Sequence, residues 1–328
     1  MERRHGLLAI VLAVTLACAG CGNENAAKSG PTVEVPRAVV SQPAETEPPK
    51  PTAPPPAARV TDRAANPDGQ VLVVEYHHIA QGKGDMFRTP QEFRKDLERL
   101  HKMGFRPVTV TDYLDNRFPI PPGSSPAVFT FDDSNPSQFQ LRDDGTVDPN
   151  CAIGIWQAFA KEHPDFPVRA TFYVLPDVMW AQPKWREKKV EMLKEMGCEL
   201  GSHTVSHPIL KRLSDEKVKQ ELAGAIDHLE KMGTPSPVSI ALPFGVSPKN
   251  KALLEKFSHA GKTYEMKAAF LVGANPAPSP TSPKLNRYRI PRIQAYNGPY
   301  GLPYWLDEVA KGNVKVWVQG DAGQTTSR

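Results

Sequence analysis

Short apolar runs alternate with longer amphipathic segments from about Gln70 to the end of the 328-residue chain, and this alternation limits the folds available to it. The short runs have the length and the β-branched and aromatic content of buried strands. We predict strands at residues 71–76, 106–110, 127–132, 170–175, 198–202, 238–242, 268–272 and 288–293. Strands that alternate with helices predict an α/β protein with a parallel sheet, either a barrel or an open doubly wound sheet.

Start and stop signals place helices between most of these strands. Thr89, Pro90 and Glu92 form a capping box with proline at the first helical position, and Gly104 ends the helix that they open. Three further helices are predicted at about residues 148–163, 185–196 and 214–233. The region 70–320 is long enough for one domain. In either architecture, functional side chains gather at the carboxyl ends of the strands.

The first 21 residues have the pattern of a bacterial export signal. Arg3 and Arg4 precede an apolar run at residues 7–19 that is too short to span a bilayer. The segment that ends in Cys21 resembles a lipoprotein box, in which this cysteine is lipidated, although Cys18 stands where that pattern has leucine. A cleaved signal peptide without lipidation is the alternative. We therefore expect an exported protein that is either anchored to the membrane, facing the extracytoplasmic side, or secreted.

Two segments flanking the domain lack side chains that could be buried. Residues 22–69 are rich in Pro, Ala, Glu, Thr and Lys, and we predict that they form a disordered linker. Residues 321–328 are expected to be a flexible tail. Of the four cysteines, only Cys151 and Cys198 lie in the predicted domain. They either pair in an oxidising compartment or remain as two buried free thiols.

The net charge gives no indication of a nucleic-acid partner. It is +4 for the whole chain, and it falls to +3 when removal of the export signal removes Glu2, Arg3 and Arg4. Such a nearly neutral chain lacks the basic character expected of a nucleic-acid-binding surface.

Three strand ends carry polar residues suited to metal chemistry. Asp132 and Asp133 end one predicted strand, His203 and His207 follow another, and His77 follows the first. Two neutral imidazoles and one carboxylate suit Zn²⁺ or a similar divalent ion and leave positions open for water and substrate. A bound metal lowers the pKa of its water, and a neighbouring carboxylate that is not a ligand can accept the water's proton.

Each of these features has a more ordinary explanation when it is taken alone. An Asp-Asp pair is usually a turn or a helix cap, and two histidines four residues apart are as often a surface pair as a ligand pair. Asp143 and Asp144 form a second acidic pair, but no apolar strand leads into them, so they are predicted to lie in a polar turn. The position at a strand end distinguishes Asp132 and Asp133 from that pair.

In chain order, Thr130-Phe131-Asp132-Asp133, His203-Thr204-Val205-Ser206-His207 and Leu242-Pro243-Phe244-Gly245 resemble the first three motifs of the polysaccharide deacetylase family. This family is also called carbohydrate esterase family 4, or the NodB-homology fold. The resemblance implies a distorted (β/α) barrel of about seven parallel strands. It also implies that Asp132 is the general base and that Asp133, His203 and His207 bind one divalent metal ion, with zinc expected and cobalt or nickel as alternatives.

The activity implied by the resemblance is that of a hydrolase acting on carbon–nitrogen bonds other than peptide bonds. Metal-activated water would remove N-acetyl groups, or alternatively O-acetyl groups, from an acetylated polysaccharide, and the enzyme would act as a monomer. The backbone N–H of Phe244 would stabilise the oxyanion. Its ring, with Tyr304 and Trp305, would line a wall around the acetyl methyl group, unless the last two are ordinary core aromatics.

The chain departs from the family pattern at several positions. Ser134 stands where the family has glycine, and the polar insertion at residues 134–150 follows it. Ala241 replaces an arginine that usually precedes the third motif. No histidine occurs after His259, so the C-terminal motif that usually supplies the proton donor is missing.

A Tyr-His pair on the first strand offers a replacement for that donor. Tyr76-His77 matches the arrangement in a branch of the family that includes lipoprotein and exopolysaccharide deacetylases acting on poly-N-acetylglucosamine. We hypothesise that His77 protonates the leaving amine and that Arg292 supplies the cation near Asp132 that Ala241 cannot. The alternative for Arg292 is a structural ion pair at a strand end.

Two functions from other classes stay open. One alternative is a carbohydrate-binding lipoprotein whose deacetylase site has decayed. The other is a metal-dependent esterase or amidohydrolase that acts on a small acylated molecule. The retained base and three retained ligands argue against decay. Peptidoglycan, chitin-like oligomers, poly-N-acetylglucosamine and acetylated xylan would each present an acetyl group to such a site.

Overall fold

A computed structural model describes residues 58–273 and 275–321, which lie within one compact unit. The predicted export signal with Cys21, most of the predicted linker and residues 322–328 of the predicted tail lie outside the described residues. Among the helices of the described part, none combines the length and the apolar character that crossing a membrane requires.

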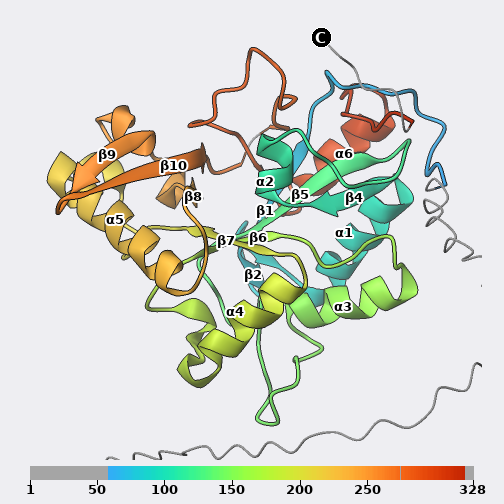
Figure 1. The fold of residues 1–328 in the computed structure, drawn as a ribbon. Helices are drawn as coiled ribbons and strands as arrows, with labels where there is room; N and C mark the ends of the chain where they lie inside the picture. Colours follow the sequence, from blue (N-terminus) through green and yellow to red (C-terminus); the bar gives the residue numbers. More distant parts are fainter. Residues whose placement is uncertain (1–57, 274, 322–328) are drawn as a thin grey trace, which may run out of the picture. The chain divides into compact units, whose positions relative to one another are not determined.

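A mostly parallel sheet forms the centre of the domain (Figure 1). Its order is β11-β1-β5-β6-β7-β8-β10-β9, and β4 pairs with the amino-terminal half of β5. Every pairing in it is parallel except that of β9 with β10. Its strands are β1 (Leu72–Tyr76), β4 (Phe105–Val108), β5 (Ser125–Phe131), β6 (Thr171–Val174), β7 (Glu199–Ser202), β8 (Val238–Ala241), β9 (Lys256–His259), β10 (Lys262–Phe270) and β11 (Ile293–Gln294).

The segment before β11 links two distant parts of this sheet. Ile290 forms a parallel bridge with Phe270 of β10, and β11 then pairs with β1. Backbone hydrogen bonds from Leu271 N–H to Ile290 O (2.8 Å) and from Ile290 N–H to Ala269 O (3.0 Å) support the bridge. One short segment therefore connects β10 to β1 and brings the strands round in the manner of a barrel. This confirms the predicted α/β class with parallel strands.

Helices surround the sheet (Figure 1). α1 begins with the predicted capping box, in which Thr89 Oγ1 accepts from Glu92 N–H and Glu92 accepts from Thr89 N–H. The helix N-terminus is stabilised because these contacts satisfy N–H groups that have no partner within the helix. The helices are α1 (Pro90–Lys102), α2 (Val110–Leu114), α3 (Ala152–Glu162), α4 (Arg186–Glu195), α5 (Asp215–Lys231) and α6 (Leu302–Ala310).

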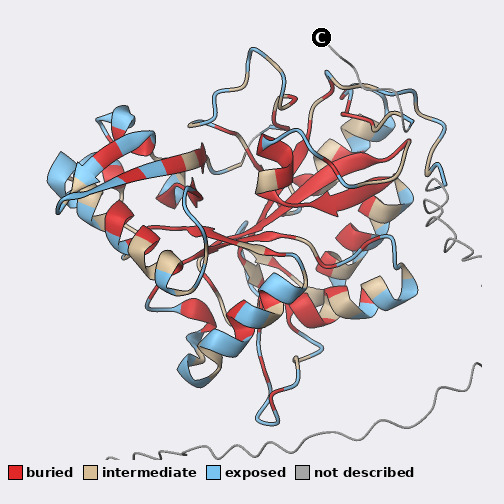
Figure 2. Ribbon diagram, viewed as in Figure 1, coloured by how far each residue is buried: buried red, intermediate tan, exposed pale blue. Residues whose placement is uncertain are grey.

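The side chains of β1 alternate between two apolar clusters. Leu72 and Val74 pack in the larger cluster with residues of α1 and α3, whereas Val71 and Val73 pack in a second cluster with Val128 and other strand residues. Successive strand residues point to opposite faces of a sheet, which explains this division. In Figure 2 the central strands are buried and the helices expose their outer faces.

The structure contains elements that the sequence patterns did not predict. They include α2, α6, a small parallel pair formed by β2 (His78–Ile79) and β3 (Phe87–Arg88), and β9 with the exposed half of β10. Residues 58–69, which composition places in the linker, contact the domain, since Val60 N–H donates to Pro122 O and Asn66 bridges Val318. Cys151 and Cys198 are both buried free thiols.

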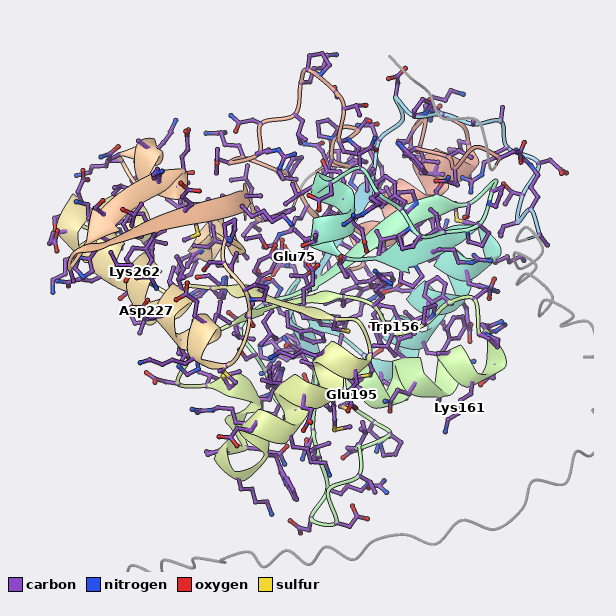
Figure 3. The ribbon with its side chains drawn as sticks, viewed as in Figure 1. Glu75, Trp156, Lys161, Glu195, Asp227 and Lys262 are labelled. Atoms are coloured by element: carbon purple, nitrogen blue, oxygen red, sulfur yellow. The ribbon has the colours of Figure 1, made fainter. Side chains whose placement is uncertain are left out.

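Aromatic packing between β5 and α3 generates a stability prediction (Figure 3). The Trp156 ring is fully buried, and its centroid lies 4.4 Å from that of Phe129. We expect Trp156→Ala to lower the free energy of unfolding by about 3–5 kcal/mol, because it leaves a large cavity. Lys161→Ala, on an exposed position of the same helix, is the control and is expected to change it by less than about 0.5 kcal/mol. Urea unfolding followed by circular dichroism checks both values, and equal losses would contradict the assignment.

Candidate metal centre and catalytic site

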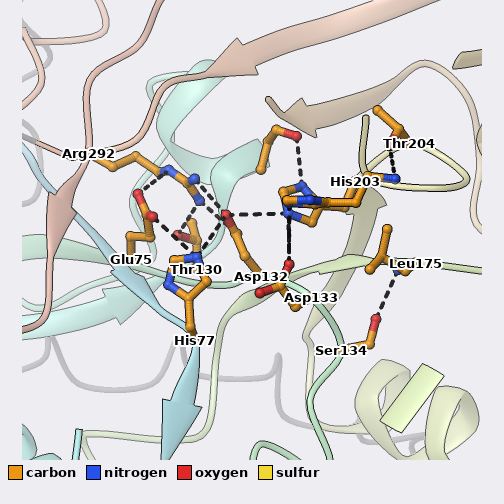
Figure 4. Close-up of polar contacts among 12 residues, drawn as sticks. Glu75, His77, Thr130, Asp132, Asp133, Ser134, Leu175, His203, Thr204 and Arg292 are labelled. Atoms are coloured by element: carbon orange, nitrogen blue, oxygen red, sulfur yellow. Dashed lines mark hydrogen bonds and ion pairs between the residues drawn. The ribbon is translucent and has the colours of Figure 1, made fainter. Parts of the chain in front are cut away.

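The carboxyl ends of β1, β5 and β7 bring His77, Asp132, Asp133 and His203 together (Figure 4). β1 and β5 run parallel with Tyr76 opposite Phe131, so the residues that follow, His77 and Asp132, also lie close to each other. Asp132 N–H donates to Tyr76 O at 3.0 Å and continues this alignment past the strands.

Asp133, His203 and His207 offer one atom each to a common point. The Oδ1 atom of Asp133 lies 3.2 Å from His203 Nε2 and 3.6 Å from His207 Nε2, and the three candidate ligand atoms all lie within 4.8 Å of one another. A tetrahedral zinc ion with ordinary bond lengths holds its ligand atoms about 3.3 Å apart. The spacing therefore fits a divalent ion.

The tautomer of His203 points to the same conclusion. Its Nδ1 lies 2.8 Å from Ala241 O, and a carbonyl oxygen only accepts, so Nδ1 carries the hydrogen. In the neutral imidazole, the lone pair of buried Nε2 then faces the Asp133 carboxylate, and Nε2 has no hydrogen-bond partner in the described part of the chain. A cation between these two electron-rich atoms would remove this repulsion. A carbonyl that fixes the tautomer of a histidine is the usual outer partner of a metal ligand.

The turn that carries both histidines is held by a side chain from α5. Glu221 accepts from the backbone N–H groups of Val205 (3.0 Å) and Ser206 (2.9 Å) and from the Ser206 hydroxyl (2.7 Å). His207 adopts a left-handed backbone with φ of 56°, and its N–H donates to Thr204 Oγ1 at 3.0 Å. Glu221 therefore stabilises a backbone conformation that L-residues seldom adopt.

Arg292 lies against Asp132, where we hypothesised a cation. Its Nη1 donates to Asp132 Oδ1 at 2.8 Å and its Nη2 to Asp132 Oδ2 at 2.7 Å, a bidentate pair buried from solvent. Burial alone would raise the pKa of Asp132, but Arg292 and then His203 outweigh it and hold that pKa below its usual range. Asp132 is therefore ionised at neutral pH.

His77 and the buried Glu75 lie on the other side of Asp132. His77 Nε2 lies 4.0 Å from Asp132 Oδ2 and 3.5 Å from Glu75 Oε1. Burial lowers the pKa of His77 to about 4, although Asp132 and Asp133 act in the opposite direction. Burial raises the pKa of Glu75 to about 8, against the effect of Arg292.

Two residues at the start of the polar insertion fasten the site. The Gln138 side-chain amide donates to both His77 O (2.8 Å) and Asp132 O, and so ties the ends of β1 and β5 together. Ser134 has a φ of 51°, in the region that glycine adopts more readily. Its hydroxyl oxygen accepts from Leu175 N–H at 2.9 Å, a contact that glycine cannot make.

Phe244 lies at the exposed rim of the site. Its side chain and backbone together are 58% exposed, and its ring centroid lies 4.7 Å from that of His207. The next two N–H groups donate within the turn, from Gly245 to Leu242 O and from Val246 to Pro243 O. The Phe244 N–H has no such partner in the described part of the chain, so it is available to a substrate oxygen.

Trp305 and Tyr304 lie on α6. Their aromatic neighbours are each other and Tyr300, with ring centroids 5.1 to 6.2 Å apart. The α6 region contacts α1 through Arg99, whose guanidinium donates to Pro303 O and to the Asp307 carboxylate. Among the described residues, neither ring forms an aromatic pair with Phe244 or with a histidine of the site.

Three residues of the site were not identified from the sequence, namely Glu75, Gln138 and Glu221. A signal for Glu75 existed, because residues 75 and 77 of a strand share one face. Gln138 lies in an insertion without periodicity, and Glu221 lies on a helix, so neither carries a local pattern that indicates its contact.

Comparisons with known proteins agree with this site. A sequence model of the family described as polysaccharide deacetylase matches residues 121–265. Peptidoglycan-N-acetylmuramic acid deacetylase PdaC of Bacillus subtilis (strain 168) is 37% identical over 76 residues. That match covers 23% of this chain and only 15% of the relative.

Solved structures share the fold over most of the chain. The Streptococcus pyogenes deacetylase PplD in complex with acetate has a TM-score of 0.54 at 18% identity and covers 73% of this chain and 98% of its own. The polysaccharide deacetylase BC0361 from Bacillus cereus has a TM-score of 0.53 at 22% identity, with coverages of 74% and 69%. IcaB from Ammonifex degensii has a TM-score of 0.50 at 18% identity, with coverages of 73% and 96%.

The contacts of Glu221 predict an effect on metal affinity without any change to a ligand. We expect Glu221→Ala to weaken zinc binding by roughly 10–100-fold, because the turn between His203 and His207 loses its support. Gln220→Ala, at the exposed neighbouring position, is the control and should bind zinc like the wild type. Isothermal titration calorimetry with Zn²⁺ measures both. An unchanged affinity in Glu221→Ala would show that the turn holds its shape without this carboxylate.

Proposed function

We propose that this chain, which carries a polysaccharide deacetylase domain, hydrolyses the N-acetyl groups of a cell-surface or extracellular polysaccharide with the help of one divalent metal ion. The observation that carries the proposal is the ionised Asp132, paired with Arg292 beside the Asp133, His203 and His207 set. The matching family model, PdaC, PplD and BC0361 are all described as deacetylases, which supports the same reaction class.

Asp133, His203 and His207 would hold the metal. When bound, zinc or a similar ion lowers the pKa of water and polarises a carbonyl oxygen. Asp132 is the proton acceptor, because Arg292 keeps its carboxylate charged while each carboxylate oxygen retains a lone pair. Its Oδ2 lies 4.0 Å from both His203 Nε2 and His77 Nε2, between the ligand set and the proton donor that we assign to His77.

The remaining groups orient the substrate. The free N–H of Phe244 would donate to the acetyl oxygen as negative charge develops on it. The exposed Phe244 ring offers an apolar surface at the rim of the site. An open rim of this kind supports a polymer as the substrate, because a chain of sugars must extend beyond the site on both sides.

We further propose that the substrate is an exopolysaccharide of the poly-N-acetylglucosamine type. Tyr76, the last residue of β1, and His77, which follows it, support this choice, since the pair stands where that branch of the family has its proton donor. Export through the first 21 residues and attachment through Cys21 would place the enzyme where such a polymer is found.

Replacement of Asp132 tests the proposed reaction. The full mature chain is loaded with Zn²⁺ or Co²⁺, and acetate release is measured from a panel of N-acetylated and O-acetylated polymers. We expect Asp132→Asn to lower release by about 100-fold or more, because the amide cannot accept the proton. Metal content should stay the same in this variant and fall in Asp133→Ala. Release that survives the Asp132→Asn change would contradict the mechanism, and metal-independent glycan binding without release would support a binding protein instead.

Replacement of Cys21 tests the proposed location. We expect the wild-type protein, expressed in a bacterium with lipoprotein processing, to sediment with the membrane and the Cys21→Ala variant to be absent from it. Cys18→Ala is the matched control and should remain membrane-bound. Fractionation followed by immunoblotting distinguishes them, and an unanchored wild-type protein would favour a secreted form.

A further inference from the structure

Glu75 is a buried carboxyl group to which the proposed reaction assigns no role. It lies on β1 two residues before His77, which follows the strand, and the two side chains meet, with Glu75 Oε1 3.5 Å from His77 Nε2. It is completely shielded from solvent, and neither carboxyl oxygen accepts a well-formed hydrogen bond in the described part of the chain. Arg292 Nε lies 3.1 Å from Glu75 Oε2, but its hydrogen is directed to Leu271 O at 2.8 Å.

A second metal ion would be one explanation for Glu75, His77 and Asp132 lying together. The guanidinium of Arg292 argues against it, because it already places a positive charge within 3.1 Å of both carboxyl groups. A divalent ion there would be repelled by this fixed cation. The group that the arrangement can take up at low cost is a proton.

The charges around Glu75 decide whether Glu75 or His77 carries that proton. The groups that face Glu75 are His77 just after its own strand, Asp132 just after β5, Arg292 and the backbone N–H of Gly273, with His203 beyond them. Since burial raises the pKa of Glu75 to about 8, its carboxyl group is protonated at neutral pH. Since burial lowers the pKa of His77 to about 4, the imidazole is neutral there. His77 alone therefore has no imidazolium proton to give.

We propose that Glu75 is a positioning residue that supplies His77 with the proton delivered to the leaving amine. The pair holds one exchangeable proton, and Glu75 Oε1 and His77 Nε2, 3.5 Å apart, are the atoms between which it moves. This inference rests on the proposed function, because it explains how the donor assigned to that reaction is charged.

The transfer balances without an added reactant. The O–H bond of Glu75 breaks as an N–H bond forms at His77 Nε2, which gives a carboxylate and an imidazolium. The imidazolium then gives its Nε2 proton to the lone pair that the broken carbon–nitrogen bond leaves on the amine nitrogen, and the ring returns to the neutral form with its hydrogen on Nδ1. Glu75 is left as a carboxylate next to Arg292, which compensates its charge, and it takes up a proton again before the next turnover.

Ring-nitrogen NMR of His77 tests the shared proton without any turnover. In the wild type we expect the His77 signals to change twice, once at acid pH as the ring titrates and again near pH 8 as Glu75 ionises. In Glu75→Gln only the first change should remain, because an amide does not titrate. A single change in the wild type would overturn the proposal, whether or not any variant folds.

Kinetics test the consequence for the reaction. We expect Glu75→Gln to lower kcat at pH 7 by 10-fold or more, with KM and zinc content unchanged. Because the two residues act as a unit, the double variant with His77→Ala should be no slower than His77→Ala alone. Additive losses, or full activity in Glu75→Gln, would overturn the proposal. Glu195→Gln, the same change at an exposed position of α4, is the control, and Figure 3 shows both glutamates.

The two measurements separate the inference from the function on which it rests. If the wild-type protein releases no acetate from any polymer, the proposed function fails, and the NMR titration still decides whether Glu75 and His77 share a proton. If acetate is released and the second titration step is missing, the function stands and the inference fails.

Discussion

The guanidinium of Arg292 sets the arrangement of the charged groups inside the domain. It makes a bidentate contact with Asp132, lies beside Glu75 and donates to the backbone of Leu271 and the hydroxyl of Thr130. It follows the bridge between Ile290 and Phe270 and precedes β11, in the segment that links β10 to β1. Removing one partner from such a buried pair typically costs about 3–5 kcal/mol. The contact that orients Asp132, the proposed proton acceptor, therefore also helps to hold the strands in place.

Three carboxyl groups share this small region, and their surroundings divide the work among them. Asp132 is held ionised by Arg292, and Asp133 faces two imidazoles that suit a metal ion. Burial raises the pKa of Glu75 and so favours its neutral form. In the proposed reaction, groups of the same type would thus serve as acceptor, ligand and proton store because of their environments, a pattern that recurs where acid and base chemistry operate together.

The main strands and the clustering of Asp133, His203 and His207 could be predicted because their signals are local. An apolar run that ends in Asp132 and Asp133 is visible in the sequence. Functional side chains gather at strand ends in this architecture, so the two residues could be identified as candidates for the site. β9 and the outer half of β10 were missed because they alternate between exposed Lys or Glu and buried residues, without an apolar run. Glu221 contacts residues that lie 15 and 16 positions before it in the sequence. Gln138 contacts the end of β1, far from it in the sequence. Only the folded chain identifies these contacts. We hypothesised that Arg292 lies near Asp132 because Ala241 cannot supply the expected positive charge. Its contact with Asp132 depends on the link between β10 and β1, which no local pattern specifies.

The departures from the family pattern bear on whether the site is intact. Ala241 removes a side chain from β8, yet Arg292 brings a guanidinium to Asp132 from a different part of the chain. Ser134 replaces glycine at a position with a left-handed backbone, yet its hydroxyl oxygen accepts a hydrogen bond from the N–H of Leu175. Random loss of function would remove such contacts one at a time and leave buried charges without partners, which is costly. At both positions a contact formed elsewhere accompanies the change, which favours a rebuilt site over a decaying one.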